Sequence, residues 1–203
     1  MKTLRLFLPL VLVLAGCAGG VKNTGRTFQT VVVDAGHGGK DSGMRSRRGG
    51  AEKNNTLDVA QRLAPKLRAA GFDTVMTRTG DYFVELNERA AISNRQHNAV
   101  FVSIHFNDAG RRGISGIEVY YNSSAALPLA QKIAQRLGSL APVRGVRPAR
   151  YRVLRKNTYP AVLVECGFMS NPREARNCAS PAYHEALATR LAAALVEQRF
   201  GAR

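Results

Sequence analysis

Acidic residues are scarce in this 203-residue chain, which has 14 Asp and Glu against 30 Lys and Arg and a formal net charge of +16. A surface with this charge attracts polyanions. The arginines are nevertheless scattered, apart from the run RSRR at 45–48, and no aromatic side chains alternate with them. Because a groove that stacks nucleic-acid bases needs such aromatics, we expect no nucleic acid among the partners.

Long apolar runs are also missing, except near the N-terminus. The stretch from Leu6 to Ala15 follows Lys2 and Arg5 and precedes small residues. It is too short to span a bilayer and has the pattern of a secretory signal, which we assign to residues 1–16. The chain is therefore predicted to be exported.

The end of this signal, Leu14-Ala15-Gly16-Cys17, resembles the bacterial lipobox, whose cysteine is lipidated and becomes the new N-terminus. Residues 17–27 would then be the lipidated cysteine and a short polar tether, and 28–203 the folded domain. The residue after Cys17 is Ala18 rather than Asp, which favours the outer membrane and a periplasmic, lipid-anchored protein. The alternative is an ordinary cleaved signal with an incidental cysteine. For an exported protein, anionic lipid head groups, lipopolysaccharide or acidic stem peptides of a cell wall fit the basic surface.

Cysteine is rare as well. Beyond Cys17 the chain has only Cys166 and Cys178. An oxidising compartment permits a disulfide between them, but nothing in their spacing requires one.

Apolar strands alternate with amphipathic helices along the rest of the chain. Strands are predicted at 31–35, 72–78, 98–107, 116–122, 150–155 and 160–168, and helices at 51–71, 86–96, 124–140 and 181–200. Several strands are apolar throughout, as in a sheet that is covered on both faces. The pattern predicts a single α/β domain with a mostly parallel, twisted sheet of about six strands between helices.

Three of the apolar runs end in a side chain that can bind a metal or exchange a proton. The first run, VVVDAGHGG, ends near His37, the second ends in SIHFN with His105, and the third in VECGF with Glu165. The glycines after the first run match neither GxGxxG nor GK[ST], so they do not indicate a phosphate site. Because the carboxyl ends of parallel strands share one edge of a sheet, these side chains should converge. Glu52, at the start of the next helix, is a fourth candidate.

Two imidazoles and one carboxylate form the ligand set of a catalytic zinc ion. Magnesium and calcium prefer oxygen ligands. The same ligands occur in non-haem iron oxygenases, but the tight His-x-Asp/Glu pair of those enzymes is missing. A further carboxylate beside the metal could accept the proton of a metal-bound water during amide hydrolysis. The structural alternatives are a turn histidine at His37, a helix-start charge at Glu52 and a salt bridge at Glu165.

The chain also resembles a known family, the zinc-dependent N-acetylmuramoyl-L-alanine amidases. The motifs are VVVDAGHGGKDSG at 31–43, EK at 52–53, the set Arg78, Asp81, Leu86 and Arg89, FVSIHFN at 101–107, GIEVYY at 116–121 and RVLRKNTYPAVLVECGFMSNPRE at 152–174. The resemblance implies cleavage of the amide between N-acetylmuramic acid and L-alanine in peptidoglycan. It also implies one zinc ion per chain, held by His37, Glu52 and His105, with Glu165 as the catalytic acid/base. Ala35 stands where the family commonly has proline, which touches neither the metal nor the acid.

Other residues of these motifs receive weaker predictions. Asn107 and Arg155 could contact substrate, and Asp34 could orient His37 or cap a turn. His97 and His184 are expected on the surface. The alternative functions are a peptidoglycan-binding lipoprotein without catalysis, or a zinc peptidase that cuts within the stem peptide. The oligomeric state is not encoded in any motif, and we favour a monomer.

Overall fold

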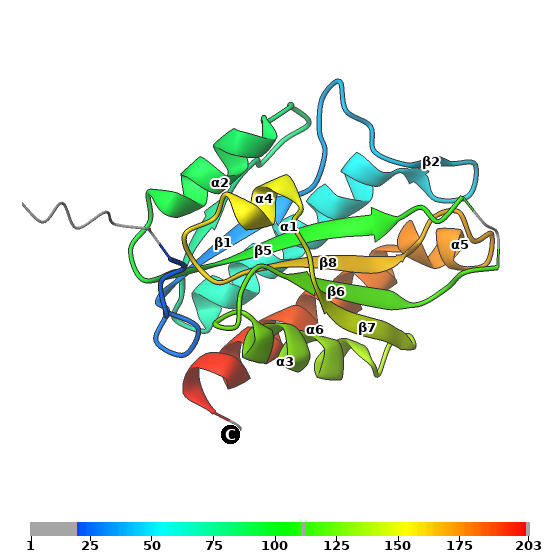
Figure 1. The fold of residues 1–203 in the computed structure, drawn as a ribbon. Coiled ribbons are helices and arrows are strands. Elements are labelled where there is room, and N and C mark those ends of the chain that lie inside the picture. The colour runs from blue at the N-terminus through cyan, green and yellow to red at the C-terminus, as the bar shows by residue number, and fades with distance from the viewer. Residues whose placement is uncertain (1–19, 111–112, 202–203) are drawn as a thin grey trace, which may run out of the picture.

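A six-stranded sheet forms the centre of the structure, a computed structural model that describes residues 20–110 and 113–201 (Figure 1). The predicted signal at 1–16 and Cys17 lie outside the described residues. The strands in spatial order are β4 (Asp73–Met76), β1 (Thr30–Ala35), β5 (Ala99–Asn107), β8 (Ala161–Phe168), β6 (Ile117–Tyr121) and β7 (Val143–Pro148). Neighbouring strands are parallel except β6 and β8, which are antiparallel. The predicted mostly parallel α/β sheet is confirmed.

The two faces of the sheet are covered unequally (Figure 1). Alternate strand residues such as Val31 and Val33 join a large core with three long helices, whereas Val32 joins a small core. The long helices are α1 (Glu52–Ala69), α3 (Leu127–Leu137) and α6 (Pro181–Phe200). Among the described residues, the helices on the second face are α2 (Leu86–Asn94) and the single turn α4 (Arg152–Arg155). Part of that face is therefore left for a pocket.

The segment 150–155 corrects one prediction. Its alternation of arginine and apolar residues suggested a strand, but the chain forms α4 there. Val153 and Leu154 are adjacent, and both are buried in the small core. A strand turns neighbouring side chains to opposite faces, whereas one helical turn can bury both. The sixth strand is instead β7, an edge strand whose Gly and Pro residues give a weak strand signal.

Smaller elements lie beside this framework. The ribbon of β2 (Arg45–Ser46) and β3 (Gly50–Ala51) precedes α1, and α5 (Glu174–Cys178) follows β8. None of these three was predicted, because each is too short to carry a periodic pattern. Cys166 and Cys178 are buried free thiols, so the disulfide that the sequence permits is not formed in this structure.

The segment assigned to a tether is bonded to the domain from Lys22 onward. The Lys22 amide donates to the Thr158 carbonyl at 2.8 Å, and the Thr24 hydroxyl donates to the Ala99 carbonyl at 2.6 Å. These contacts lie at the edge where β5 and β8 begin. Within residues 20–110 and 113–201, no helix is both long and apolar enough to cross a membrane.

His184 corrects another prediction, whereas His97 is exposed as expected. The His184 side chain is buried between α6, α1 and α5. Its Nδ1 lies 2.6 Å from Asp58 Oδ2, and its Nε2 lies 2.6 Å from the Cys178 carbonyl oxygen. The polar neighbours in sequence suggested a surface position, but this histidine joins three helices.

Candidate active site

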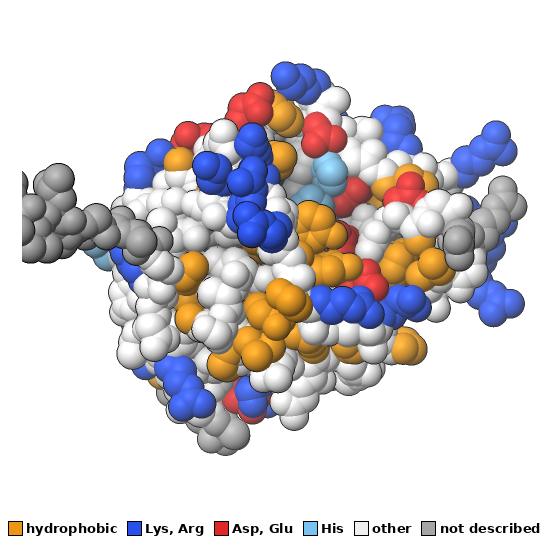
Figure 2. Space-filling view, viewed as in Figure 1, with side chains coloured by type: hydrophobic (Ala, Val, Ile, Leu, Met, Phe, Trp, Pro, Cys, Tyr) orange, Lys and Arg blue, Asp and Glu red, His pale blue; other side chains and the backbone are white. Residues whose placement is uncertain are grey.

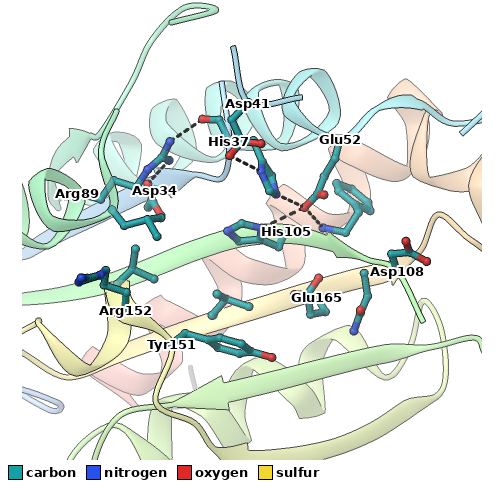
Figure 3. A pocket seen from close by; sticks show the side chains of 15 residues that line it. Asp34, His37, Asp41, Glu52, Arg89, His105, Asp108, Tyr151, Arg152 and Glu165 are labelled. Carbon is teal, nitrogen blue, oxygen red and sulfur yellow. Dashed lines mark hydrogen bonds and ion pairs between the residues drawn. The ribbon is translucent and has the colours of Figure 1, made fainter. Parts of the chain in front are cut away.

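A pocket of about 310 Å³ opens on the less covered face of the sheet, at the carboxyl ends of β1, β5 and β8 (Figures 2 and 3). Figure 2 shows pale-blue histidine side chains in this hollow beside red acidic ones. Its lining includes His37, Asp41, Glu52, Leu86, His105, Asn107, Asp108, Tyr151, Arg152, Leu163 and Glu165. The pocket thus contains the side chains that end the three apolar runs.

His37, Glu52 and His105 converge on one point. Glu52 Oε1 lies 3.0 Å from His37 Nε2 and 3.0 Å from His105 Nδ1. One ligand atom of each residue lies within 4.8 Å of the others, so the three could hold a metal ion. Two imidazole nitrogens and a carboxylate oxygen are the donor set that zinc prefers. The residues present therefore fit the expected metal.

The glycines around His37 make this convergence possible. A Cβ atom at Gly36 would collide with the His105 ring, and one at Gly43 would lie 2.5 Å from Glu52 Oε2. His37 itself has a φ of 61°, a left-handed conformation that is uncommon for residues other than glycine. The glycine-rich turn therefore clears space for the two imidazoles.

Asp41, rather than Asp34, orients His37. The Asp41 Oδ2 atom lies 2.9 Å from His37 Nδ1, which leaves Nε2 directed toward Glu52. Asp34 instead accepts hydrogen bonds from Arg89 at 2.8 Å, Thr77 at 2.6 Å and Ser103 at 2.6 Å. The sequence carried no signal for this contact, because residues 37–41 form a glycine-rich turn and not a helix.

Glu52 is held as a carboxylate. Its Oε1 accepts from the Phe106 amide at 3.0 Å, and its Oε2 from the Met44 amide at 2.9 Å. Burial raises the pKa of Glu52, but hydrogen bonds with His105 and His37 outweigh it and hold the pKa far below the usual range. Burial likewise lowers the pKa of His105, yet the hydrogen bond and charge of Glu52 raise it to about 9. Without metal, His105 therefore carries the proton and Glu52 remains ionised.

Glu165 differs from Glu52 because no described residue forms a hydrogen bond or ion pair with its carboxylate. It is the neighbour of His105 across the β5–β8 ladder, and its carboxylate faces the His105–Glu52 pair (Figure 3). Its Oε2 atom is buried and makes no hydrogen bond. Burial raises the pKa of Glu165 to about 7, and the nearby charges of Glu52 and Glu118 act in the same direction. Such a carboxyl group can exchange protons near neutral pH.

The two residues predicted to contact substrate are separated by the structure. Asn107 lines the pocket, whereas Arg155 is exposed and is not among the lining residues. Tyr151 and Arg152, from the same short segment as Arg155, line the pocket instead. The wrong prediction of a strand at 150–155 led to the wrong arginine, because the helical turn α4 determines which arginine faces the pocket.

Comparisons with known proteins give the same picture. A family model described as N-acetylmuramoyl-L-alanine amidase matches residues 31–197. The uncharacterized protein YqiI of Bacillus subtilis is 35% identical over 182 residues, which cover 87% of this chain and 86% of that protein. The putative N-acetylmuramoyl-L-alanine amidase YrvJ of the same organism is 38% identical over 160 residues, 77% of this chain but 31% of the longer relative.

A solved structure is similar as well. The N-acetylmuramoyl-L-alanine amidase AmiC2 of Nostoc punctiforme superimposes with a TM-score of 0.79 at 37% sequence identity. The match covers 88% of this chain and 98% of that one.

Proposed function

We propose that this chain, which belongs to the N-acetylmuramoyl-L-alanine amidase family, works with a zinc ion held by His37, Glu52 and His105 and with Glu165 as its catalytic acid/base. The chain is a peptidoglycan amidase, and its reaction is hydrolysis of the amide between N-acetylmuramic acid and L-alanine. The ligand set, the identity of the metal and the role of Glu165 are the proposed parts.

One observation carries the assignment of roles. Among the acids of the pocket, Glu52 is fixed by its contacts with two histidines and two backbone amides, whereas the buried Oε2 of Glu165 has no partner. A buried unpaired carboxylate costs folding free energy, because water no longer solvates it. A role in acting on the substrate explains why such a carboxylate lies beside a cluster that can bind a metal.

The residues divide the chemistry between them. A bound zinc ion supplies a Lewis acid that polarises the amide carbonyl and lowers the pKa of a water ligand. Asp41 fixes the ring of His37, so that Nε2 remains available as a ligand. Glu165 takes a proton from the attacking water at its carboxylate and delivers it to the departing L-alanine nitrogen. Its pKa near 7 allows both steps in one turnover.

Substrate binding is assigned to three residues on the wall of the pocket. Asn107 is retained from the sequence, and Arg152 and Tyr151 replace Arg155. None of the described side chains forms an ion pair with Arg152. An acidic stem peptide is the partner that this free charge fits.

Digestion of purified sacculi tests the reaction. The mature chain should release stem peptides that begin with a free L-alanine amino group and leave glycan strands without peptide, as identified by mass spectrometry. Cuts within the stem peptide would favour the zinc peptidase alternative. Binding to sacculi without any product would favour the non-catalytic lipoprotein.

The proposed location is the periplasm, with a lipid anchor at Cys17 on the outer membrane. The domain contacts begin at Lys22, at the edge where β5 and β8 start, whereas the pocket lies at the opposite ends of these strands. A short anchor at Cys17 would thus direct the pocket away from the membrane, toward the wall. More than one acyl chain is needed for stable anchoring.

Fractionation of cells tests the anchor. Cys17→Ser should abolish the lipid mass and either block signal processing or release the protein to the soluble fraction. Cys178→Ser is the control, since this buried thiol lies inside the domain. A wild-type protein without lipid mass, or a Cys17 variant with unchanged membrane fractionation, would contradict the anchor.

A further inference from the structure

A row of charged side chains crosses three neighbouring strands on the pocket face of the sheet. His105 on β5 is the register partner of Glu165 on β8, and Glu165 is in turn the register partner of Glu118 on β6. Register partners point to the same face, with Cβ atoms about 5 Å apart. Glu118, which neither the proposed mechanism nor the metal cluster uses, is buried next to the reacting carboxylate.

Four donors surround the Glu118 carboxylate. Its Oε2 accepts from the Tyr120 hydroxyl at 2.8 Å and from Asn107 Nδ2 at 3.0 Å. Its Oε1 accepts from Arg147 Nη1 at 3.1 Å and from Arg144 Nε at 3.4 Å. An ionised carboxylate only accepts hydrogen bonds, and two guanidinium groups stabilise that form. Glu118 is therefore a fixed anion beside the pocket.

Gly145 makes room for this arrangement. It is the register partner of Glu118 on β7, and a Cβ atom there would lie 2.8 Å from the Arg147 guanidinium carbon. A side chain at position 145 would therefore force the end of the Arg147 side chain to shift from its present position beside Glu118. The edge strand β7 thus contributes a cation to the surroundings of Glu118.

The anion determines which end of the Asn107 amide faces the pocket. Because Glu118 can only accept, the amide nitrogen of Asn107 must point to it, and Oδ1 is turned away. Asn107 is half-buried and lines the pocket, and its Oδ1 has no hydrogen-bond donor among the described residues. Asn107 Oδ1 is therefore an acceptor on the pocket wall that can bind an N–H or O–H group of the substrate.

We propose that Glu118 is a positioning residue, which holds Asn107 so that Oδ1 accepts a hydrogen bond from the first peptide N–H beyond the scissile amide. This inference rests on the proposed function, in which Glu165 serves the departing nitrogen. Successive residues of an extended peptide are about 3.6 Å apart at most. Asn107 and Glu165 are both neighbours of Glu118. Asn107 Oδ1 can therefore reach the N–H that follows, along the stem peptide, the nitrogen served by Glu165.

The experiment compares two muramoyl substrates that differ in one group. The first has an ordinary peptide bond after L-alanine, and in the second an ester oxygen replaces that N–H. Wild type should prefer the amide by about ten-fold in kcat/KM. The ester cannot donate a hydrogen bond to Asn107 Oδ1, and its oxygen instead faces Oδ1, so that two acceptors lie opposite each other. Asn107→Ala should cleave both substrates equally.

Glu118→Gln should lose most of the preference, since a glutamine amide can present either end to Asn107. Arg147→Gln removes one of the cations that hold Glu118 and leaves the pocket wall in place, so the preference should fall partially even if Glu118→Gln does not fold. Glu174→Gln is the matched control. Glu174 also holds neighbouring strands through two backbone amides, from Gly116 at 2.7 Å and Phe168 at 2.8 Å, but it does not line the pocket. It should keep the wild-type preference whatever its stability.

The outcomes separate the two levels of the argument. An active wild type without preference, or an unchanged preference in Asn107→Ala, in Arg147→Gln or in a folded Glu118→Gln, overturns the inference alone. A preference that falls equally in Glu174→Gln also overturns it, because the effect would then be general loosening of the sheet. A wild type that cleaves neither substrate at the muramoyl amide overturns the proposed function as well.

Discussion

Two buried carboxylates stand at the same edge of the sheet, and their surroundings are opposite. Asp34, near the end of β1, is fully buried and bonds to Arg89, Thr77 and Ser103. Glu165, on β8, is half-buried, and its buried Oε2 atom has no hydrogen-bond partner among the described residues. The pKa of Asp34 is raised by burial but lowered more strongly by these partners, whereas burial dominates at Glu165 and raises its pKa to about 7.

The difference separates a structural acid from a reactive one. Arg89 donates to Asp34 and also to the Ala35 and His37 carbonyls, at 2.6 Å each, so this buried pair fixes the turn that carries His37. The Glu165 side chain makes no hydrogen bond to any described residue, and it lines the pocket. One acid therefore builds the loop, and the other is left available for substrate.

Removing the structural acid should have the largest effect on stability. Asp34→Ala leaves the Arg89 charge buried and unpaired, which costs about 3–5 kcal/mol of unfolding free energy. Denaturation in urea, followed by circular dichroism, measures this loss. Glu185→Ala is the control, because its ion pairs with Arg62 and Lys66 lie at the surface and should contribute little to stability. A loss below about 1 kcal/mol for Asp34→Ala would show that the pair does not hold the turn.

The reactive acid should give stability a pH dependence of the opposite sign to that of a paired acid. The pKa of Glu165 rises from 4.5 to about 7 on folding, so the folded state binds its proton more tightly. Its contribution to stability is complete below pH 4.5 and is lost as the pH rises to about 7. The total change is about 3 kcal/mol, on the scale of 1.36 kcal/mol per pKa unit.

Subtracting a variant isolates this effect. Unfolding free energies of the metal-free wild type and Glu165→Gln should be compared across this pH range. The wild-type value should fall relative to the variant, since other groups, including Asp34, cancel in the difference. A difference that stays constant or rises with pH would mean that Glu165 is paired in solution.

The smallest expected effect concerns the support of a metal ligand. Asp41→Asn weakens the acceptor that fixes His37 and should reduce metal affinity about 10- to 100-fold, as measured by competition with a chelating dye. Asp108→Asn is the matched control, since Asp108 lines the same pocket but its Oδ1 accepts from the Gly110 amide and not from His37. Equal losses in both variants would indicate a general charge effect instead of a contact with His37.

The sequence was sufficient for the parts of the molecule that follow from local pattern. The apolar runs of β1, β5 and β8 predict parallel strands, and parallel strands bring His37, His105 and Glu165 to one edge. Side-chain partners could not be predicted in this way. Whether Asp34 or Asp41 contacts His37 depends on how the glycine turn folds back.

The same limit applies to the walls of the pocket. Arg152 rather than Arg155 faces the pocket because α4 is one helical turn, and that turn forms to bury Val153 and Leu154 against the sheet. Glu118 lies in a strand predicted correctly, but its neighbours come from β5 and from an unpredicted edge strand. Contacts between distant segments decide both cases.

The central claim is that Glu165 acts on substrate and Glu52 on the metal. It is tested most directly by measuring zinc content and amidase activity on the same preparations of Glu165→Gln and Glu52→Ala. Glu165→Gln should retain about one zinc per chain while activity falls by about 10²- to 10⁴-fold, the usual contribution of a general acid–base group. Glu52→Ala should lose zinc and activity together. Loss of zinc from Glu165→Gln, or full activity with zinc retained, would contradict the account.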